Sequence, residues 1–319
     1  MRLHGYVVAS LVTSALSLCN SSFAADTRIA KANSLRAVDD INYKIEAYGG
    51  SLNGDGTGGV AGAVTIPLGH RFGVQIDAMA GSLQGDFVGG LGAHLFWRDP
   101  SRGMIGLYAS HTRWDVFTGL NANHIGAEGE LYMGRFTLSA LVGVEDGNAA
   151  ASVVGPLLIS YNVNTRFFDT INLHYYLQDN WKLTLGHRYL GGLHAAAFGM
   201  EFAFEAGQKQ MMSAFFEARV GENDFRGIYG GLKMYFGERS KPLIKRHRQD
   251  DPEIWLPTTQ ATMTNSRTIT NALPSSVTVA QCNGQNGSTS AVLNDSMQYD
   301  YFCVLPGGTV PISDPQNLP

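Results

Sequence analysis

The chain has 319 residues, of which 44% are hydrophobic and only 16% are charged, and its formal net charge is −4. This balance lacks the basic surplus typical of nucleic-acid-binding proteins. With 38 glycines and many aromatic residues, it is also unlike the composition of a disordered chain. We therefore expect a folded protein with one large domain and additional segments, and no nucleic-acid partner.

The N-terminus has the pattern of a secretory signal peptide. A short basic start precedes an apolar run from Tyr6 to Leu18, and Ser22-Phe23-Ala24 forms a small-x-small cleavage site. A buried helix or a membrane anchor is the alternative, but the run is too short to span a bilayer. Lipid attachment at Cys19 is disfavoured because the bulky Leu18 precedes it. We predict a Sec signal peptide over 1–24 and a periplasmic segment over 25–42.

From Tyr43 to Phe236, apolar and polar side chains alternate with period two, which is typical of strands with one apolar and one polar face. About twelve runs have this pattern: 43–51, 58–66, 72–81, 87–97, 103–112, 122–133, 136–145, 165–177, 181–190, 194–204, 211–220 and 225–236. Their lengths are those of tilted strands that cross a bilayer, and an even number is expected of a bacterial outer-membrane barrel. The sequence therefore predicts an all-β fold, a transmembrane antiparallel β-barrel over 43–236.

The connections between these runs differ in length. One set comprises 67–71, 98–102, 134–135, 178–180 and 205–209, and the other comprises 52–58, 82–86, 112–121, 146–164, 191–193 and 221–224. Outer-membrane barrels have short periplasmic turns and longer extracellular loops. The first set is therefore predicted to be periplasmic, together with the N-terminus.

Aromatic residues recur at the predicted periplasmic strand ends: Phe72, Trp97, Phe136, Trp181, Phe204 and Phe236. Aromatic residues at one depth are typical of the interfacial girdle of a membrane barrel. The alternative is a set of scattered core aromatics in a soluble β protein. A last strand that ends on an aromatic also resembles the signal read by the barrel assembly machinery, which we expect as a partner besides outer-membrane lipid.

A soluble sheet would normally place its apolar face on a core and its charges in water. In the best runs here the apolar face is uniform and the charges lie on the other face, which favours lipid outside and a polar lumen inside. A closed sheet also pairs every backbone group, as lipid requires. An exported soluble barrel that binds a small ligand remains the nearest alternative, although lipocalin-like barrels usually have eight strands.

Twelve polar positions are candidates for the pore lining: Lys44, Glu46, Gln75, Asp77, Glu128, Glu130, Lys182, Arg188, Glu201, Glu217, Arg219 and Lys233. They mix both charge signs, unlike the single-sign lining of a strongly ion-selective channel. Two interpretations stay open for them, structural filling of the lumen and lining of a narrow pore.

No constellation of catalytic residues is recognisable. Ser110 and His111 are adjacent on one strand and so point to opposite faces. The histidines lack metal-ligand spacing, and the glycine-rich stretch 54–59 fits a hairpin loop. We therefore expect no enzymatic activity, no cofactor and no metal.

The C-terminal part, 237–319, is predicted to be a mostly irregular periplasmic extension, with exposure outside the cell or contact with peptidoglycan as alternatives for residues 257–319. Its first stretch is rich in basic residues and is either solvated or an anchor on the phospholipid leaflet. Its composition from 257 onward is rich in Thr, Ser, Asn, Gly and Pro. Cys282 and Cys303 form an even pair in an exported chain, which predicts a disulfide.

Three stretches, "GHRYLGG" (186–192), "FFEARVGENDFRGIYGGLKMYFG" (215–237) and "KPLIKRHRQDDP" (241–252), resemble porin-like outer-membrane proteins of alphaproteobacteria that are poorly characterised. The resemblance implies an exported barrel of a Gram-negative outer membrane and supplies no ligand or catalytic residue. The sequence thus predicts a passive small-solute pore or a structural membrane protein, with a surface adhesion protein as a further alternative. It leaves the solute and the oligomeric state open.

Overall fold

The computed structural model describes residues 35–115, 119–149, 152–154, 157–161, 164–207, 210–237, 241–256, 267–271, 276–293, 299–305, 308–313 and 315–317. The signal peptide predicted for 1–24 and most of the segment predicted for 25–42 lie outside the described residues.

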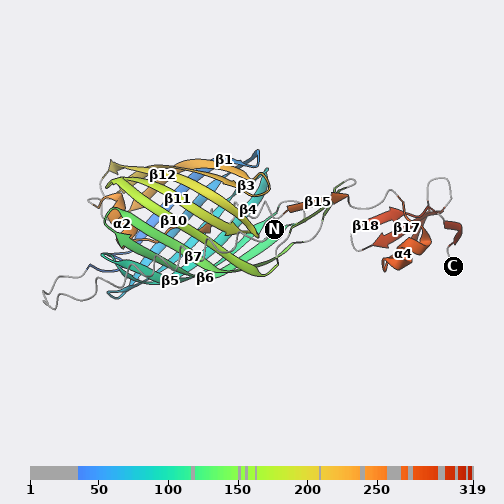
Figure 1. The fold of residues 1–319 in the computed structure, drawn as a ribbon, viewed down its shortest axis with the longest axis horizontal. Helices are drawn as coiled ribbons and strands as arrows, with labels where there is room; N and C mark the ends of the chain where they lie inside the picture. Colours follow the sequence, from blue (N-terminus) through green and yellow to red (C-terminus); the bar gives the residue numbers. More distant parts are fainter. Residues whose placement is uncertain are drawn as a thin grey trace, which may run out of the picture. The chain divides into compact units, whose positions relative to one another are not determined.

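Twelve antiparallel strands form one closed barrel, in which each strand is hydrogen-bonded to two neighbours (Figure 1). The strands are β1 (Asn42–Leu52), β2 (Asp55–Leu68), β3 (Phe72–Leu83), β4 (Asp86–Asp99), β5 (Gly103–Trp114), β6 (Leu120–Met133), β7 (Phe136–Ala149), β10 (Arg166–Gln178), β11 (Trp181–Leu190), β12 (Leu193–Gly207), β13 (Gln210–Gly221) and β14 (Arg226–Phe236). Every alternating run predicted from the sequence is one of these strands. The prediction of a twelve-stranded antiparallel barrel is therefore confirmed.

The barrel closes between its first and last strands, with Tyr43 opposite Phe236 and Leu52 opposite Gly227. Because β1 also pairs with β2, and β14 with β13, the wall has no free edge. Such closure satisfies the backbone polar groups that lipid cannot satisfy. We call the end that holds Tyr43 and Phe236 the entry end, and the opposite end the far end.

The two ends differ in the length of their connections. At the entry end, strands are joined by 69–71, 100–102, 134–135, 179–180 and 208–209. The longest connections, 115–119 and 150–165, are at the far end. The tightest far-end turns include Asn53-Gly54, whose φ angles of 54° and 92° are the positive pair of a type I′ hairpin.

The outer face of the wall is apolar, and the inner face is polar. Leu91, Ile105 and Ile125 are 63%, 65% and 68% exposed, whereas Asp77 and His94 are buried. An apolar face of this extent is unfavourable in water and favourable in lipid. The barrel therefore has the exterior of a membrane-spanning protein.

Aromatic side chains mark the entry end of the wall. The six predicted girdle residues all lie in the strand residues nearest this end: Phe72, Trp97, Phe136, Trp181, Phe204 and Phe236. Phe72 lies opposite Trp97 across β3 and β4, and Phe136 stacks on Tyr175 with ring centroids 4.7 Å apart. Rings at a single depth fit the interface between lipid chains and water.

The chain beyond β14 contains regular elements that its composition did not indicate. Helix α2 (Leu243–Gln249) follows the barrel, and β15 (Arg267–Asn271) pairs with β9 (Leu157–Tyr161), which also pairs with β8 (Ser152–Val154). Within the described parts of the chain, no helix has the length and apolar character needed to cross a membrane.

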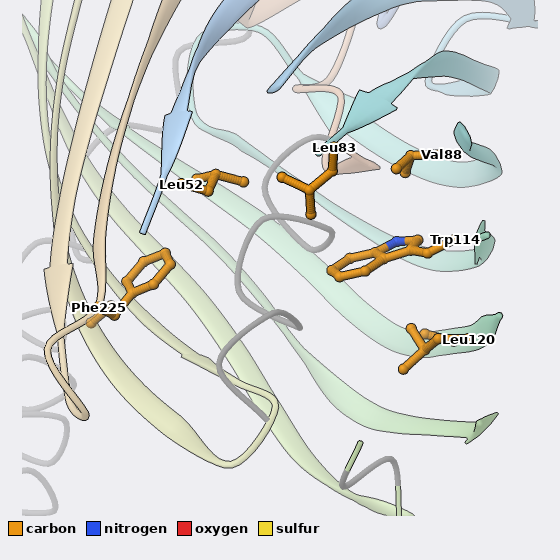
Figure 2. Close-up of a cluster of buried hydrophobic side chains, with 8 residues drawn as sticks. Leu52, Leu83, Val88, Trp114, Leu120 and Phe225 are labelled. Carbon is orange, nitrogen blue, oxygen red and sulfur yellow. The ribbon is translucent and has the colours of Figure 1, made fainter. Parts of the chain in front are cut away.

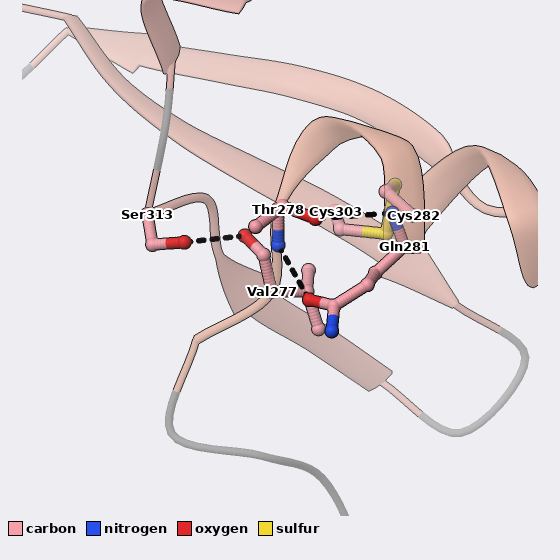
Figure 3. Close-up of a disulfide and its surroundings, with 6 residues drawn as sticks. All are labelled: Val277, Thr278, Gln281, Cys282, Cys303 and Ser313. Carbon is pink, nitrogen blue, oxygen red and sulfur yellow. Dashed lines mark hydrogen bonds between the residues drawn. A yellow bond between two sulfur atoms is a disulfide. The ribbon is translucent and has the colours of Figure 1, made fainter.

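The last described residues form a small unit of their own, which we call the disulfide module (276–317). It contains α4 (Val279–Gly284) and the sheet β16–β17–β18 (Ser288–Leu293, Tyr299–Leu305, Gly308–Pro311), with η3 (Pro315–Asn317) after it. Thr278 caps α4 by accepting from Gln281 N, and the predicted disulfide joins Cys282 to Cys303 (Figure 3).

Candidate functional site

The twelve candidate pore-lining residues all turn away from lipid. Glu130, Glu217 and Lys233 are half-buried, and the other nine are buried. The alternation along each strand therefore assigned their faces as observed. Whether they line a path for solute depends on what else occupies the lumen.

The lumen is occupied by residues 241–256, which we call the luminal segment. It begins at the entry end, where Leu243 N donates to Asn180 Oδ1 and Ile244 N donates to Asp179 O, both in the β10–β11 turn. The Leu243 side chain packs with Ala203, Met211 and Tyr235 of the wall. Helix α2 thus lies against the inner wall at this mouth.

The chain preceding β1 covers the same mouth. Ala37 N donates to His70 O in the β2–β3 turn, and Ala37 and Val38 are fully buried beside Phe96 and Met104. Lys241 Nζ lies 2.6 Å from Asp39 Oδ2, and this contact connects the luminal segment to the residues that precede β1. Both flanks of the barrel sequence therefore close over the entry end.

Two of the basic residues of α2 are held against protein, whereas a third, Lys245, is exposed. Arg248 donates to Gly134 O and Phe136 O at 2.8 Å, and its guanidinium lies over the Tyr132 and Tyr176 rings. Arg246 is 1% exposed. The alternative that this stretch anchors on phospholipid is wrong for these two residues, because the wall already surrounds them.

Two of the acidic residues after α2, Asp251 and Glu253, pair with basic residues of the wall. Asp251 Oδ2 lies 2.7 Å from Lys44 Nζ, and each side chain is 6% exposed. Lys44 also donates to Pro252 O at 2.9 Å, and Gln75 donates to the same carbonyl at 3.4 Å. Because a buried charge is costly without a partner, these pairs hold the segment in place.

Glu253 is the most extensively paired acidic residue of the luminal segment. Its carboxylate lies 3.1 Å from Asn172 Nδ2, 3.2 Å from His174 Nε2 and 3.5 Å from Lys182 Nζ. Lys182 also contacts Glu201, which lies 3.3 Å away. One carboxylate of the segment thus completes a polar network spread over β10, β11 and β12.

Across the lumen, the segment ends on a second polar network. His94 lies between Asp77, at 2.9 Å, and Glu128, at 3.0 Å. Glu128 also accepts a hydrogen bond from Trp255 Nε1 at 3.1 Å. The Trp255 ring packs among buried residues of four strands, Tyr108, Leu141, Phe168 and Leu190, so the segment is held by apolar as well as polar contacts.

A polar cavity of about 100 Å³ remains beside the luminal segment, which is room for several water molecules. Its wall includes eight of the twelve candidates, namely Lys44, Glu46, Glu130, Lys182, Arg188, Glu201, Glu217 and Lys233. Its other side is formed by His247, Arg248 and Asp251 to Trp255 of the luminal segment. These eight candidates therefore surround a small cavity and the segment itself.

Nearer the far end, the inner face of the wall becomes apolar. Figure 2 shows this cluster, which we call the apolar collar: Leu52, Leu83, Val88, Trp114, Leu120, Ala122, Ala195 and Phe225. Trp114 is fully buried. An apolar cluster inside a lumen opposes the passage of ions, because hydrated ions cannot exchange water for polar groups there.

Sequence reasoning missed several luminal residues. His94 and His174 face inward and link the acidic groups, although only formally charged residues and Gln75 were selected. Their inward orientation could have been predicted, because His94 alternates with Leu95 and His174 alternates with Leu173. The luminal segment itself had a weaker signal, the change from basic to acidic residues around Gln249.

Three residues of catalytic type lie side by side on adjacent strands. Ser110 is opposite His124, and His124 is opposite Glu145, whose carboxylate lies 3.4 Å from it. Ser110 and His111 do point to opposite faces, as predicted. However, Glu145 is also bound by Arg166 and by Gly191 N, and His124 is fully buried. The row is not part of the cavity lining. Of its members, Glu145 is held by other groups of the barrel, whereas Ser110 Oγ and both ring nitrogens of His124 have no hydrogen-bond partner among the described residues.

No family model matches the chain, and no curated protein matches it. Among solved structures, it is similar to the KdgM porin in complex with disordered oligogalacturonate (8% identity, TM-score 0.41, 61% of this chain and 98% of that one). It is also similar to an outer membrane channel from Pseudomonas putida F1 (11%, 0.45, 62% and 95%) and to the outer membrane protein Omp33 of Acinetobacter baumannii (10%, 0.36, 62% and 98%). Because these identities and TM-scores are low, the barrel architecture is established by the strand pairing and not by these similarities.

Proposed function

We propose that this chain is a Gram-negative outer-membrane barrel whose own C-terminal segment occupies the lumen. It acts as a structural membrane protein with at most a narrow path for water and small ions, and not as an open porin. The observation that carries this proposal is the luminal segment, with Asp251 on Lys44 and Glu253 on His174 and Lys182.

Burial makes the loss of one partner of these pairs costly. Removing one partner of a buried ion pair costs about 3–5 kcal/mol, because the other charge stays in a poorly solvated site. Such a change multiplies the fraction of molecules with a displaced segment by about 100-fold or more. Closure by charge pairing is therefore open to test by single charge reversals.

The test is single-channel conductance of the full-length mature chain in planar lipid bilayers. The unmodified chain is expected to show small or no steps. Asp251→Lys places a second cation beside Lys44, and it should produce frequent large openings. The exchanged pair Lys44→Asp with Asp251→Lys restores opposite charges and should close the lumen again. Large, continuous conductance of the unmodified chain would contradict the proposal.

A gel-mobility measurement separates this proposal from the soluble ligand-binding alternative. A closed membrane barrel extracted in mild detergent should migrate faster before boiling than after it. A chain found in the soluble periplasmic fraction, with no mobility shift, would favour the soluble protein. The apolar exterior of Leu91, Ile105 and Ile125 supports the membrane protein.

The finer parts of the proposal rest on sequence features. The stretches at 186–192, 215–237 and 241–252 support membership of the porin-like group of alphaproteobacteria. The aromatic end of β14 supports insertion by the barrel assembly machinery. The buried row Ser110, His124 and Glu145 supports a non-enzymatic role, since it lies outside the cavity lining and its carboxylate is paired with Arg166.

A further inference from the structure

The luminal segment advances along the barrel axis residue by residue. Lys241 and Arg248 contact Asp39 and the β6–β7 turn at the entry end. Asp251 reaches Lys44, the third residue of β1, and Pro252 O reaches Gln75, the fourth residue of β3. Successive residues of the segment thus contact wall positions farther from the entry end.

By the end of the described segment, the chain has passed the middle of the wall. Leu256 packs with Ala61 and Met79. A Cβ atom at Gly90 would lie 3.2 Å from Leu256 Cδ2, and Gly90 is only four residues from the far end of β4 (Asp86–Asp99) but nine from its entry end. The chain at Leu256 is therefore closer to the far end than to the entry end.

The next described residues pair with a far-end connection. Strand β15 is antiparallel to β9, with Arg267 opposite Tyr161 and Asn271 opposite Leu157. Strand β9 belongs to 150–165, which joins β7 to β10 at the far end. Ten residues, 257–266, separate Leu256 from Arg267, and an extended chain of that length reaches about 33 Å. The chain that enters at the entry end is thus found at the far end.

We propose that the C-terminal part of the chain is threaded through the barrel and that the disulfide module is displayed at the cell surface. This inference rests on the proposed outer-membrane barrel. The short turns of the entry end make that end periplasmic and the far end extracellular. The periplasmic location that the sequence suggested for 237–319 is the competing arrangement.

The disulfide module has the features of a water-exposed unit in an oxidising compartment, which is consistent with the cell surface. Val277, Val279, Leu305, Val310 and Ile312 form its buried core with both cysteines, whereas Ser288, Thr289 and Ser290 are exposed. A unit of this size has little core, so a disulfide in an oxidising compartment adds the missing stability. These properties fit a domain presented to the medium.

The experiment compares three positions of one epitope tag in full-length chains expressed in a Gram-negative host. The tag follows Pro319, or is inserted in the far-end turn Gln84-Gly85, or in the entry-end turn Gly134-Arg135. Antibody binding is measured on intact and on permeabilised cells. We expect the tags at Pro319 and at Gln84-Gly85 to be detected on intact cells, and the tag at Gly134-Arg135 only after permeabilisation.

If the Pro319 tag, like the Gly134-Arg135 tag, were detected only after permeabilisation, threading would be overturned while the membrane barrel would stand. Recovery of all three chains in the soluble periplasm would overturn the barrel and display together. Because an inserted tag can disturb folding, the unmodified chain is tested as well. Antibodies against a disulfide-bonded peptide of 276–317 should label intact cells, and labelling that requires permeabilisation would again overturn threading.

Discussion

The barrel wall and the disulfide module place their side chains in opposite ways. The wall exposes Ile105 and Ile125 and buries Lys44 and Asp77, whereas the module buries Val310 and Ile312. Alternating strands alone are compatible with both arrangements. The difference indicates that lipid surrounds the wall and water surrounds the module, so two parts of one chain are adapted to different solvents.

The largest effect is expected where the wall resembles the module, in its apolar collar. Trp114→Ala removes a fully buried ring, and truncation of a buried aromatic costs about 3–5 kcal/mol. We expect a lower temperature for loss of the fast-migrating gel band. Trp97→Ala, on the outer face of β4, is the control and should change this temperature less. Equal effects would mean that the collar is not a packed core.

A charge on the outer face tests the lipid environment directly. Ile125→Arg, at a site that is 68% exposed, should destabilise a barrel in phospholipid vesicles by about 2–4 kcal/mol if the site is near the bilayer midplane. Guanidinium unfolding followed by tryptophan fluorescence measures this loss. A neutral outcome would contradict the assignment of this face to lipid.

Removal of the disulfide should affect the module alone. In Cys282→Ser with Cys303→Ser, a loop closed at a sequence separation of 21 opens, which costs about 3 kcal/mol. Proteolysis within 276–317 should accelerate, while the heat-dependent gel shift of the barrel stays unchanged. A parallel loss of the barrel shift would show that the two regions do not fold independently.

The smallest effect is expected for a charge on the outer face of the module. Val304 is 41% exposed, and Val304→Lys should change the stability of the module by less than about 0.5 kcal/mol, since water solvates the new charge. Limited proteolysis of 276–317 measures this change. This substitution and Ile125→Arg form a matched pair. A large loss of module stability in Val304→Lys would contradict the inference that water surrounds the module and lipid surrounds the wall.

Much of the wall was predictable because its determinants are local. Period-two alternation around Gln75 and Asp77 identified a strand and its luminal face, and Phe236 was correctly identified as the end of the last strand. The pairing of Cys282 with Cys303 followed from their number. Residues such as His94 and His174 obey the same alternation, but histidine is formally neutral and so does not stand out among the charged luminal positions.

The luminal segment was not predictable from such rules. Lys44 and Pro252 are 208 positions apart, and a basic-to-acidic stretch such as 245–251 is equally compatible with water, with a membrane surface or with another protein. The row Ser110, His124 and Glu145 was missed for a related reason. Its members come together through strand register, which neighbouring residues in the sequence do not reveal.

By itself, the sequence determined the number of strands, their inner and outer faces and the disulfide, because alternation and residue type act over a few positions. Only the tertiary structure decided that Asp251 and Glu253 lie in the lumen. That outcome depends on how the buried cations are paired once the wall has closed. A segment distant in the chain supplies the carboxylate beside Lys44 and a second carboxylate for Lys182, which already contacts Glu201 of the wall.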